Sequence, residues 1–307
     1  MNWLIFVIIA TVTSAGRIFT DNYVSDVYFK KSGAVAQKFF YGFIDSISAI
    51  IILIAIGFNF LQTDYYSIGI ILLSGALTGI ASITYFKALE IEDSTNIGIF
   101  MQVTPIFYLI FGWLFFGEFF SPLQLLAFII ILIAPTLIVF AAKKRSRKVK
   151  IRAIIYILIS VIIGVIGNLI FVKANAESFD FMDKIAFFLL GKGIANIVIV
   201  SIYPKWRKRW QTIFKNSKHK VLRPMLVSSL ISLIKEFSYH GALITAPAVA
   251  LASVVIDSAV PIVIFFMGIV LTLIWPKFGR EKLDRKTVIV HLIATILVVT
   301  GIIILQF

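Results

Sequence analysis

Residues 83–118 read ITYFKALEIEDSTNIGIFMQVTPIFYLIFGWLFFGE, and parts of this stretch return near the other end of the chain. The pattern Tyr-x-x-Ala-Leu occupies residues 85–89 and again residues 239–243. A second match pairs residues 105–112 with residues 261–268, which share Pro, Ile and Gly at the same spacing. The shared order of these matches indicates an internal repeat, with one copy in each half of the chain.

The composition is that of a membrane protein. Hydrophobic residues make up 60% of the 307 residues, against about 45–50% in soluble domains, and the mean hydropathy is +1.00. Because only 14% of the residues are charged, a water-soluble enzyme, a disordered chain and a nucleic-acid-binding domain are excluded. The net charge of +14 is therefore interpreted as membrane topology, and no nucleic-acid partner is expected.

Ten apolar stretches are each long enough to cross the bilayer as a helix, which takes about 20 residues. They are Trp3–Phe19, Phe39–Phe58, Tyr66–Phe86, Asn96–Phe116, Leu123–Ala142, Ala153–Val172, Ile185–Tyr203, Leu222–Ile244, Pro247–Trp275 and Thr287–Gln306. We therefore predict an all-α integral membrane protein with ten transmembrane helices.

The basic residues predict how these helices are oriented. Of the 29 Lys and Arg residues, 25 lie in or border the connections after the odd-numbered stretches. By the positive-inside rule these connections are cytoplasmic, so both termini are expected outside the plasma membrane. The connection Lys205–Arg223 alternates basic and aromatic residues, and we expect its tryptophans at the headgroup level and its charges on anionic membrane lipids.

The repeat divides the chain into two halves of five helices each. We place the first at residues 1–142 and the second at residues 153–307, joined by a basic cytoplasmic linker at residues 143–152. Because five is odd, the second half enters the membrane in the opposite orientation. Two inverted five-helix repeats are typical of secondary transporters, whose halves exchange conformations around a midplane site.

The first half resembles the signature of a known family, the EamA-like branch of the drug/metabolite transporter superfamily. The residues that carry the resemblance are Gly79, Tyr85, Ala88, Leu89, Pro105, Gly112, Gly117, Glu118, Gln124 and Leu125, with a fainter second copy at Tyr239, Ala242, Pro261, Gly268 and Glu281. The resemblance covers nearly the whole chain and implies a transporter fold without naming a substrate. Its members usually keep both termini in the cytoplasm, whereas the charges here predict the reverse.

Charged residues inside the predicted spans are the first candidates for function, because a charge within a bilayer is costly. They are Lys192, Lys235, Glu236 and Asp257. Glu236 and His240 are four residues apart and share one helix face, with Tyr239 beside them. Our hypothesis is that Glu236 or Asp257 is a protonatable or substrate-binding carboxylate. The alternative is a static ion pair of a lysine with one of these carboxylates, which orients helices and binds nothing.

Other polar and helix-breaking residues complete the predicted site. Asn168, Gln102 and Tyr85, the counterpart of Tyr239, are candidate substrate contacts, although Asn168 and Gln102 could equally bond neighbouring helices. Pro105 and Pro261 hold equivalent places in the two halves and are candidate helix breaks that line a cavity.

Three further residues are given structural interpretations. Arg17 and Asp45 are placed near the cytoplasmic helix ends, where long side chains can reach water. Gly75, with Gly79, has the spacing of a close helix crossing.

Several chemistries are excluded by what the sequence lacks. It has no cysteine, its three histidines are far apart, and it contains no phosphate-binding glycine loop, so no metal, cofactor or bound nucleotide is expected. Intramembrane catalysis would need paired Asp clusters or a Ser–His arrangement, and neither pattern is present. We therefore predict a non-enzymatic protein whose partners are a small-molecule substrate and membrane lipids; a homodimer is left open.

The predicted function is secondary-active transport of a small polar or amphipathic metabolite across the plasma membrane by alternating access, with proton coupling as a hypothesis. The first alternative is a flippase for a lipid-linked phosphate, whose anion a cation such as Lys235 could meet. A non-transporting membrane partner is the second alternative.

Overall fold

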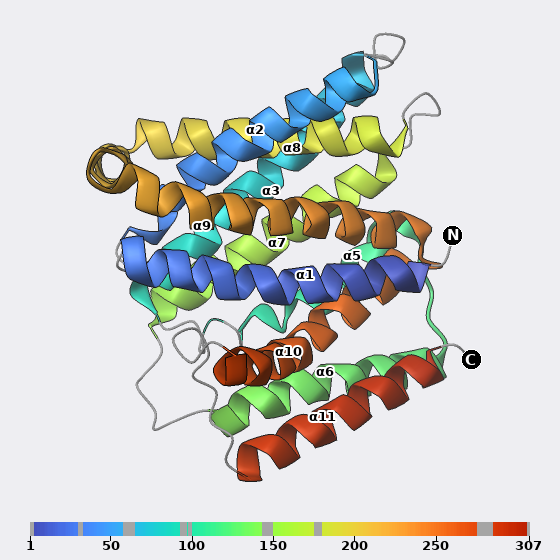
Figure 1. The fold of residues 1–307 in the computed structure, drawn as a ribbon. Helices are drawn as coiled ribbons and strands as arrows, with labels where there is room; N and C mark the ends of the chain where they lie inside the picture. Colours follow the sequence, from blue (N-terminus) through green and yellow to red (C-terminus); the bar gives the residue numbers. More distant parts are fainter. Residues whose placement is uncertain are drawn as a thin grey trace.

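The computed structural model describes residues 3–29, 33–57, 65–92, 97, 100–142, 150–174, 180–274 and 285–305, which are almost entirely helical and contain no strand (Figure 1). The helices are α1 (Trp3–Val24), η1 (Ser25–Phe29), η2 (Ala34–Gln37), α2 (Lys38–Ala55), α3 (Tyr65–Ile91), α5 (Thr104–Phe116), α6 (Pro122–Ala142), α7 (Ile151–Lys173), α8 (Phe181–Ile202), α9 (Pro204–Thr245), α10 (Val249–Ile274) and α11 (Arg285–Ile304). A helix satisfies its own backbone hydrogen bonds, which a bilayer requires because it supplies no partners.

Within the described residues, six helical segments are long and apolar enough to cross a membrane. They are Trp3–Asp21, Ala34–Ala55, Tyr65–Ile91, Ile151–Lys173, Phe181–Ile202 and Val249–Leu271, and shorter apolar segments lie at Thr104–Phe116, Pro122–Ala134 and Val288–Ile304. Large apolar side chains such as Ile5, Ile8 and Val12 of α1 are exposed on the outside of the bundle. Such a surface suits lipid, and the protein is a multi-pass membrane protein.

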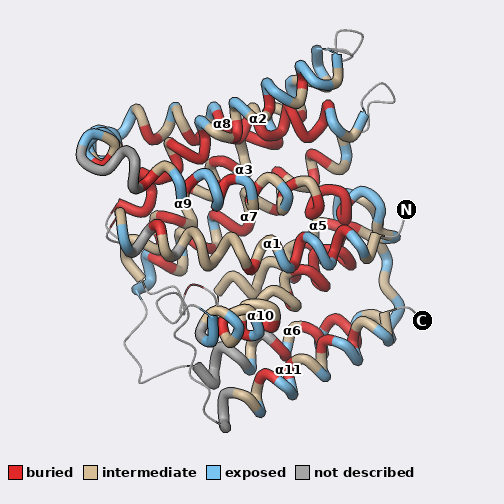
Figure 2. The backbone as a smooth tube through the Cα atoms, viewed as in Figure 1, coloured by how far each residue is buried: buried red, intermediate tan, exposed pale blue. Residues whose placement is uncertain are grey.

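Helices from the two halves of the chain lie side by side. In the upper part of Figure 1, α2 and α3 pack against α8, α3 also packs against α7, and α1 packs against α9. Below them, α10 lies next to α1, and α6 pairs with α11. Figure 2 shows buried residues along α2, α8 and α1.

Helices α3 and α8 cross closely at glycine residues. A Cβ added at Gly75 would overlap the Phe188 carbonyl oxygen, and one added at Gly191 would overlap the Leu72 carbonyl oxygen. Gly79 also faces α8, with the Lys192 carbonyl oxygen 3.0 Å from an added Cβ. The predicted close crossing at Gly75 and Gly79 is confirmed. The helix that packs closely against these glycines is α8.

The structure differs from the sequence prediction at the start of α5 and in the interior of α10. The span predicted from Asn96 contains α5, which begins at Thr104 after a turn at residues 102–103; Asn96 lies outside the described residues. Pro105 occupies the first turn of α5, where its missing N–H costs no hydrogen bond. Pro261, by contrast, lies inside α10, so the expectation of a helix break there was wrong. One missing N–H removes only one hydrogen bond, the one that Asp257 would accept, and the helix continues past it.

The basic stretch Lys205–Arg223 is also not the connection that we expected. It forms the first part of α9, which Figure 1 shows end-on before the helix turns and crosses the bundle toward Thr245. Pro224 lies inside the helix between these two parts and accounts for the bend. The tryptophans do not face headgroups alone, because Trp206 is buried and Trp210 stacks on Phe39 with ring centroids 4.0 Å apart.

Candidate functional site

Glu236 lies at the centre of a buried ion network near the middle of the bundle. Its Oε1 atom is 2.9 Å from Lys192 Nζ and 3.7 Å from Arg17 Nη1. Its Oε2 atom is 3.4 Å from Lys235 Nζ. Three helices, α1, α8 and α9, therefore meet at one carboxylate. Buried charges are tolerated when they are paired in this way, because mutual attraction offsets the loss of water.

Two further carboxylates extend the network to α2 and along α1. Asp45 Oδ2 lies 3.4 Å from Lys192 Nζ, and both side chains are buried. Asp21 accepts a hydrogen bond from Tyr41 (2.6 Å) and pairs with Arg17 Nε at 3.3 Å. The expectation that Asp45 reaches water at a helix end was wrong, because the surrounding helices bury it and the Lys192 ammonium group replaces the water. Arg17 remains partly exposed, with 18% of its side chain accessible, and it also pairs with Asp21 and Glu236.

A small cavity lies beside this network, and the volume that the centre of a water molecule can occupy in it is about 10 Å³. That is space for roughly one water molecule. The side chains lining it come from α1, α2, α8 and α9: Arg17, Lys38, Tyr41, Asp45, Lys192, Asn196, Ser228, Ser229 and Ser232. A larger, open hollow of about 440 Å³ lies beside Ile56 and residues 180–183, and it shares no residue with the network.

Some polar atoms in this region have no hydrogen-bonding partner. Asn196 Nδ2 and Ser229 Oγ are buried without one, and both residues line the cavity. His240 donates from Nδ1 to the Glu236 carbonyl oxygen at 2.8 Å, which leaves its buried Nε2 without a partner. Its ring lies 4.3 Å from the rings of Phe171 and Phe188, so His240 is packed among aromatic side chains.

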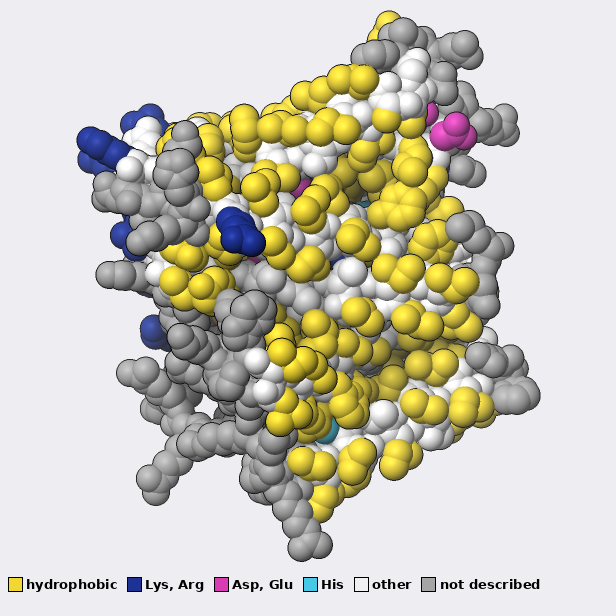
Figure 3. Space-filling view, in the orientation of Figure 1, with side chains coloured by type: hydrophobic (Ala, Val, Ile, Leu, Met, Phe, Trp, Pro, Cys, Tyr) yellow, Lys and Arg dark blue, Asp and Glu magenta, His cyan; other side chains and the backbone are white. Residues whose placement is uncertain are grey.

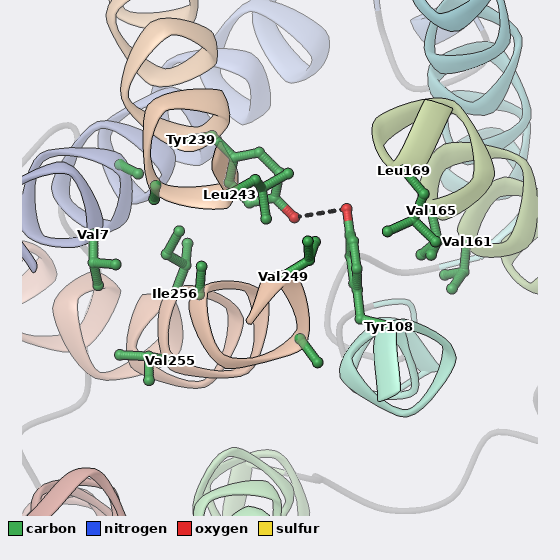
Figure 4. Close-up of a cluster of buried hydrophobic side chains, with 14 of the residues drawn as sticks. Val7, Tyr108, Val161, Val165, Leu169, Tyr239, Leu243, Val249, Val255 and Ile256 are labelled. Carbon is green, nitrogen blue, oxygen red and sulfur yellow. Dashed lines mark hydrogen bonds between the residues drawn. The ribbon is translucent and has the colours of Figure 1, made fainter. Parts of the chain in front are cut away.

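Tyr239 belongs to a second polar group that joins the two halves. Figure 4 shows its hydroxyl pointing from α9 to the hydroxyl of Tyr108 on α5, 3.0 Å away. Asn168 Nδ2 on α7 donates to the same Tyr108 hydroxyl at 2.7 Å. Apolar residues surround this group, among them Leu243 and Val165. The sequence did not single out Tyr108, since nothing in an apolar helix distinguishes a buried tyrosine from one facing lipid.

The remaining predicted site residues lie apart from the Glu236 network. Asp257 on α10 accepts a hydrogen bond from Ser253 at 3.1 Å, and no described Lys, Arg or His lies within 4.0 Å of its carboxylate. Lys235, by contrast, belongs to that network through Glu236, and its Nζ atom also lies over the Tyr239 ring, 4.6 Å from the ring centre. Gln102 is in the turn before α5, and Tyr85 packs edge-on against Phe86 on α3.

Glu118 has a structural role at a helix terminus. It follows α5, and its carboxylate accepts hydrogen bonds from Val249 N at 2.6 Å and Ala250 N at 3.4 Å. These are the first two residues of α10, whose free N–H groups favour a negative charge. Burial raises the pKa of the Glu118 carboxyl group, and the two backbone donors oppose that shift. Its counterpart Glu281 lies outside the described residues.

The fold and the paired charges define a helical membrane protein with a buried polar site. Sequence comparison adds a family likeness: residues 1–140 match the model of the EamA-like transporter family. The proteins of that family are transporters.

Solved structures support the fold over the whole length. One crystal structure of a protein superposes over 96% of this chain and 95% of its own, with a TM-score of 0.64 and 14% sequence identity. That likeness concerns the fold alone. No curated protein matches the chain in sequence.

Proposed function

We propose that the protein is a secondary-active transporter that moves a small polar metabolite across the plasma membrane by alternating access. The observation that carries this proposal is the ion network around Glu236. Its members come from α1 and α2 in the first half of the chain and from α8 and α9 in the second. A site shared by two halves is opened or closed when the halves move against each other.

The proposed architecture is ten transmembrane helices in two inverted five-helix repeats, residues 1–142 and 153–307. The helix contacts support it. If each helix is replaced by its counterpart in the other half, the contacts between helices map onto other contacts that the structure contains. The packing of α1 on α9 corresponds to that of α7 on α3, while α2 with α8 and α6 with α11 are contacts between corresponding helices. A two-fold axis in the membrane plane relates contacts in this way.

The network suits a gate better than a fixed scaffold. A buried ion pair contributes little net stability compared with an apolar pair, because both charges lose their water. Four helices nevertheless place polar side chains here, and a cavity lies beside these side chains. When one half moves, the partners of Lys192 and Arg17 on the other half separate, and water or substrate must replace them.

We assign the coupling role to Asp257 rather than to Glu236. Glu236 has three cations within 4.0 Å, so protonating it would leave buried positive charge without compensation. Asp257 has one neutral donor, Ser253, and can take up a proton without breaking an ion pair. Pro261 also lacks the N–H that would occupy the Asp257 carbonyl oxygen, which adds an acceptor at this position.

The test is transport by the purified protein reconstituted into liposomes, with a panel of amino acids, amines, sugars, nucleosides and organic acids at several pH values. We expect saturable uptake of a soluble solute that depends on a pH gradient. Asp257→Asn should abolish that dependence, whereas the control Asp183→Asn, a change at a buried aspartate in the first turn of α8 outside the network, should keep it.

Two results would contradict the proposal. Full transport by Asp257→Asn at every pH would remove the coupling role. Movement of polyprenyl phosphates, with none of the soluble solutes transported, would replace the solute carrier by a flippase.

A further inference from the structure

Lys38, at the start of α2, is a buried cation without an anionic partner. It is 1% exposed, yet no described carboxylate lies within 4.0 Å of its Nζ atom. The atom instead lies over the Phe86 ring, 4.1 Å from its centre, and 5.2 Å from that of Tyr41. A cation–π contact returns only part of the hydration that a buried ammonium loses. Burial of this ammonium group is therefore unfavourable.

The cluster formed by Lys38 and the Glu236 network also carries a net positive charge. Among the described residues, the cations of the cluster are Arg17, Lys38, Lys192 and Lys235, and the carboxylates that pair with them are Asp21, Asp45 and Glu236. Each carboxylate already has a cationic partner, and one positive charge is left over. One negative charge would balance the cluster, whereas a doubly charged anion would overcompensate it.

The cavity supplies hydrogen-bond donors for such an anion. Lys38 lines it together with Asn196 and Ser229. The Asn196 amide nitrogen and the Ser229 hydroxyl are buried and have no partner, so both can donate to an incoming oxygen. Buried donors without partners are rare in proteins, and each one calls for an explanation.

We propose that this cavity binds the carboxylate group of the transported substrate, with Lys38 as its counter-ion and Asn196 and Ser229 as neutral donors. This inference rests on the proposed transport function and narrows the substrate to a solute that carries a single carboxylate. The space in the present conformation accepts about one oxygen atom, so the remainder of the substrate enters when the halves separate.

The experiment is thermal unfolding of the purified full-length protein with sodium acetate or with neutral, isosteric acetamide, at constant ionic strength. Acetate should raise the Tm saturably and acetamide should not, because a ligand that binds only the folded state stabilises it. In Lys38→Met the affinity for acetate should fall by about tenfold or more, since the charge-assisted contact is lost. Lys208→Met, which removes an exposed charge of α9, should respond to acetate as the native protein does.

The basal stability of Lys38→Met distinguishes a lost ligand site from a damaged fold. Without acetate this variant should unfold at a higher temperature than the native protein, because it no longer buries an unpaired charge. Stabilisation by acetamide equal to that by acetate, an undiminished acetate response in Lys38→Met, or a response to inorganic phosphate in place of acetate would each overturn the carboxylate site.

The two proposals fail separately. If the protein transports only neutral or cationic solutes, and Lys38→Met does not change the rate, the carboxylate site is wrong and transport stands. If acetate binds through Lys38 and no solute crosses the membrane, the site stands and the transport proposal is wrong.

Discussion

At the scale of single residues, Glu236 has more cationic neighbours than any other carboxylate among the described residues. Its two oxygens are shared by Lys192, Lys235 and Arg17. The three cations therefore depend on Glu236 for compensation of their charge. Asp257, with a single hydroxyl partner, is in the opposite situation.

Replacing Glu236 by Gln should lower the free energy of unfolding by about 3 kcal/mol, because it removes one charge from a buried pair and leaves the others without compensation. The matched change Asp257→Asn should cost less than about 1 kcal/mol, since no ion pair is lost. Chemical or thermal unfolding of the two purified variants in the same detergent measures this difference. Equal losses of stability would show that the ion pairs of Glu236 contribute no more to stability than the single hydrogen bond of Asp257.

The sequence identifies part of this site and misses part of it. Lys192, Lys235 and Glu236 stand out because a charge in the middle of an apolar stretch is rare. Arg17, Lys38 and Asp45 do not, since each lies near an end of its stretch, where hydropathy alone cannot distinguish burial from contact with water. Which cation meets which carboxylate depends on the packing of α1, α2, α8 and α9, and no single helix contains that information.

At the scale of helices, the crossing of α3 and α8 brings Lys192 toward the first half of the chain. Gly75 and Gly191 allow the two backbones to approach because neither carries a Cβ. Lys192 follows Gly191 directly, so the position of its ammonium group depends on how closely the helices cross.

Gly75→Ala should therefore destabilise the protein by about 1–3 kcal/mol, because the new methyl group overlaps the Phe188 carbonyl and forces the helices apart. The control is Gly69→Ala on the same helix, where an added Cβ meets nothing within 4 Å. That change should be neutral or slightly stabilising, since Ala is the better helix former. Thermal unfolding distinguishes the two, and a stable Gly75→Ala variant would contradict the close crossing.

Glu118 joins the end of α5 to the beginning of α10. Glu118→Ala should cost about 1 kcal/mol, as expected when a helix N-terminus loses its capping acceptor. Glu118→Gln keeps one acceptor oxygen and should cost less. Hydrogen exchange at the Val249 and Ala250 amides provides the measurement. Protection unchanged in Glu118→Ala would show that the carboxylate does not hold this terminus.

Helix positions were easier to predict than helix ends. The apolar stretches predicted where α1, α2, α3, α7, α8 and α10 lie, because burial in lipid requires continuous hydrophobic runs. The basic run at the start of α9 was interpreted as a connection, since charge indicates water and says nothing about backbone conformation. It is helical and continuous with the following span.

At the scale of the whole molecule, charge and chain ends are separated. The Lys and Arg side chains visible in Figure 3 lie toward one end of the bundle, and in the same view of Figure 1 the N and C labels lie at the other end. Hydrophobic side chains cover the surface between them. This arrangement supports cytoplasmic placement of the basic end by the positive-inside rule.

Reporter fusions test this orientation. A reporter after Phe307 should be active only outside the cell, and one inserted at Lys148 only inside, because the basic connections stay in the cytoplasm. A second fusion at Lys208, on the exposed basic part of α9, should agree with the one at Lys148. The reverse pattern would show that both termini are cytoplasmic, as is usual in the family.

The long helix α9 makes the molecule suitable for spectroscopic study. Its surface part and the turn that carries Lys235 and Glu236 belong to one continuous helix, bent at Pro224, so the surface part is covalently and helically connected to the ion network. The chain contains no cysteine, so a single cysteine introduced at exposed Lys208 or Thr212 could be labelled selectively, with no native cysteine to remove first. A spin or fluorescent label there would report the cycle of the buried site from outside the bilayer.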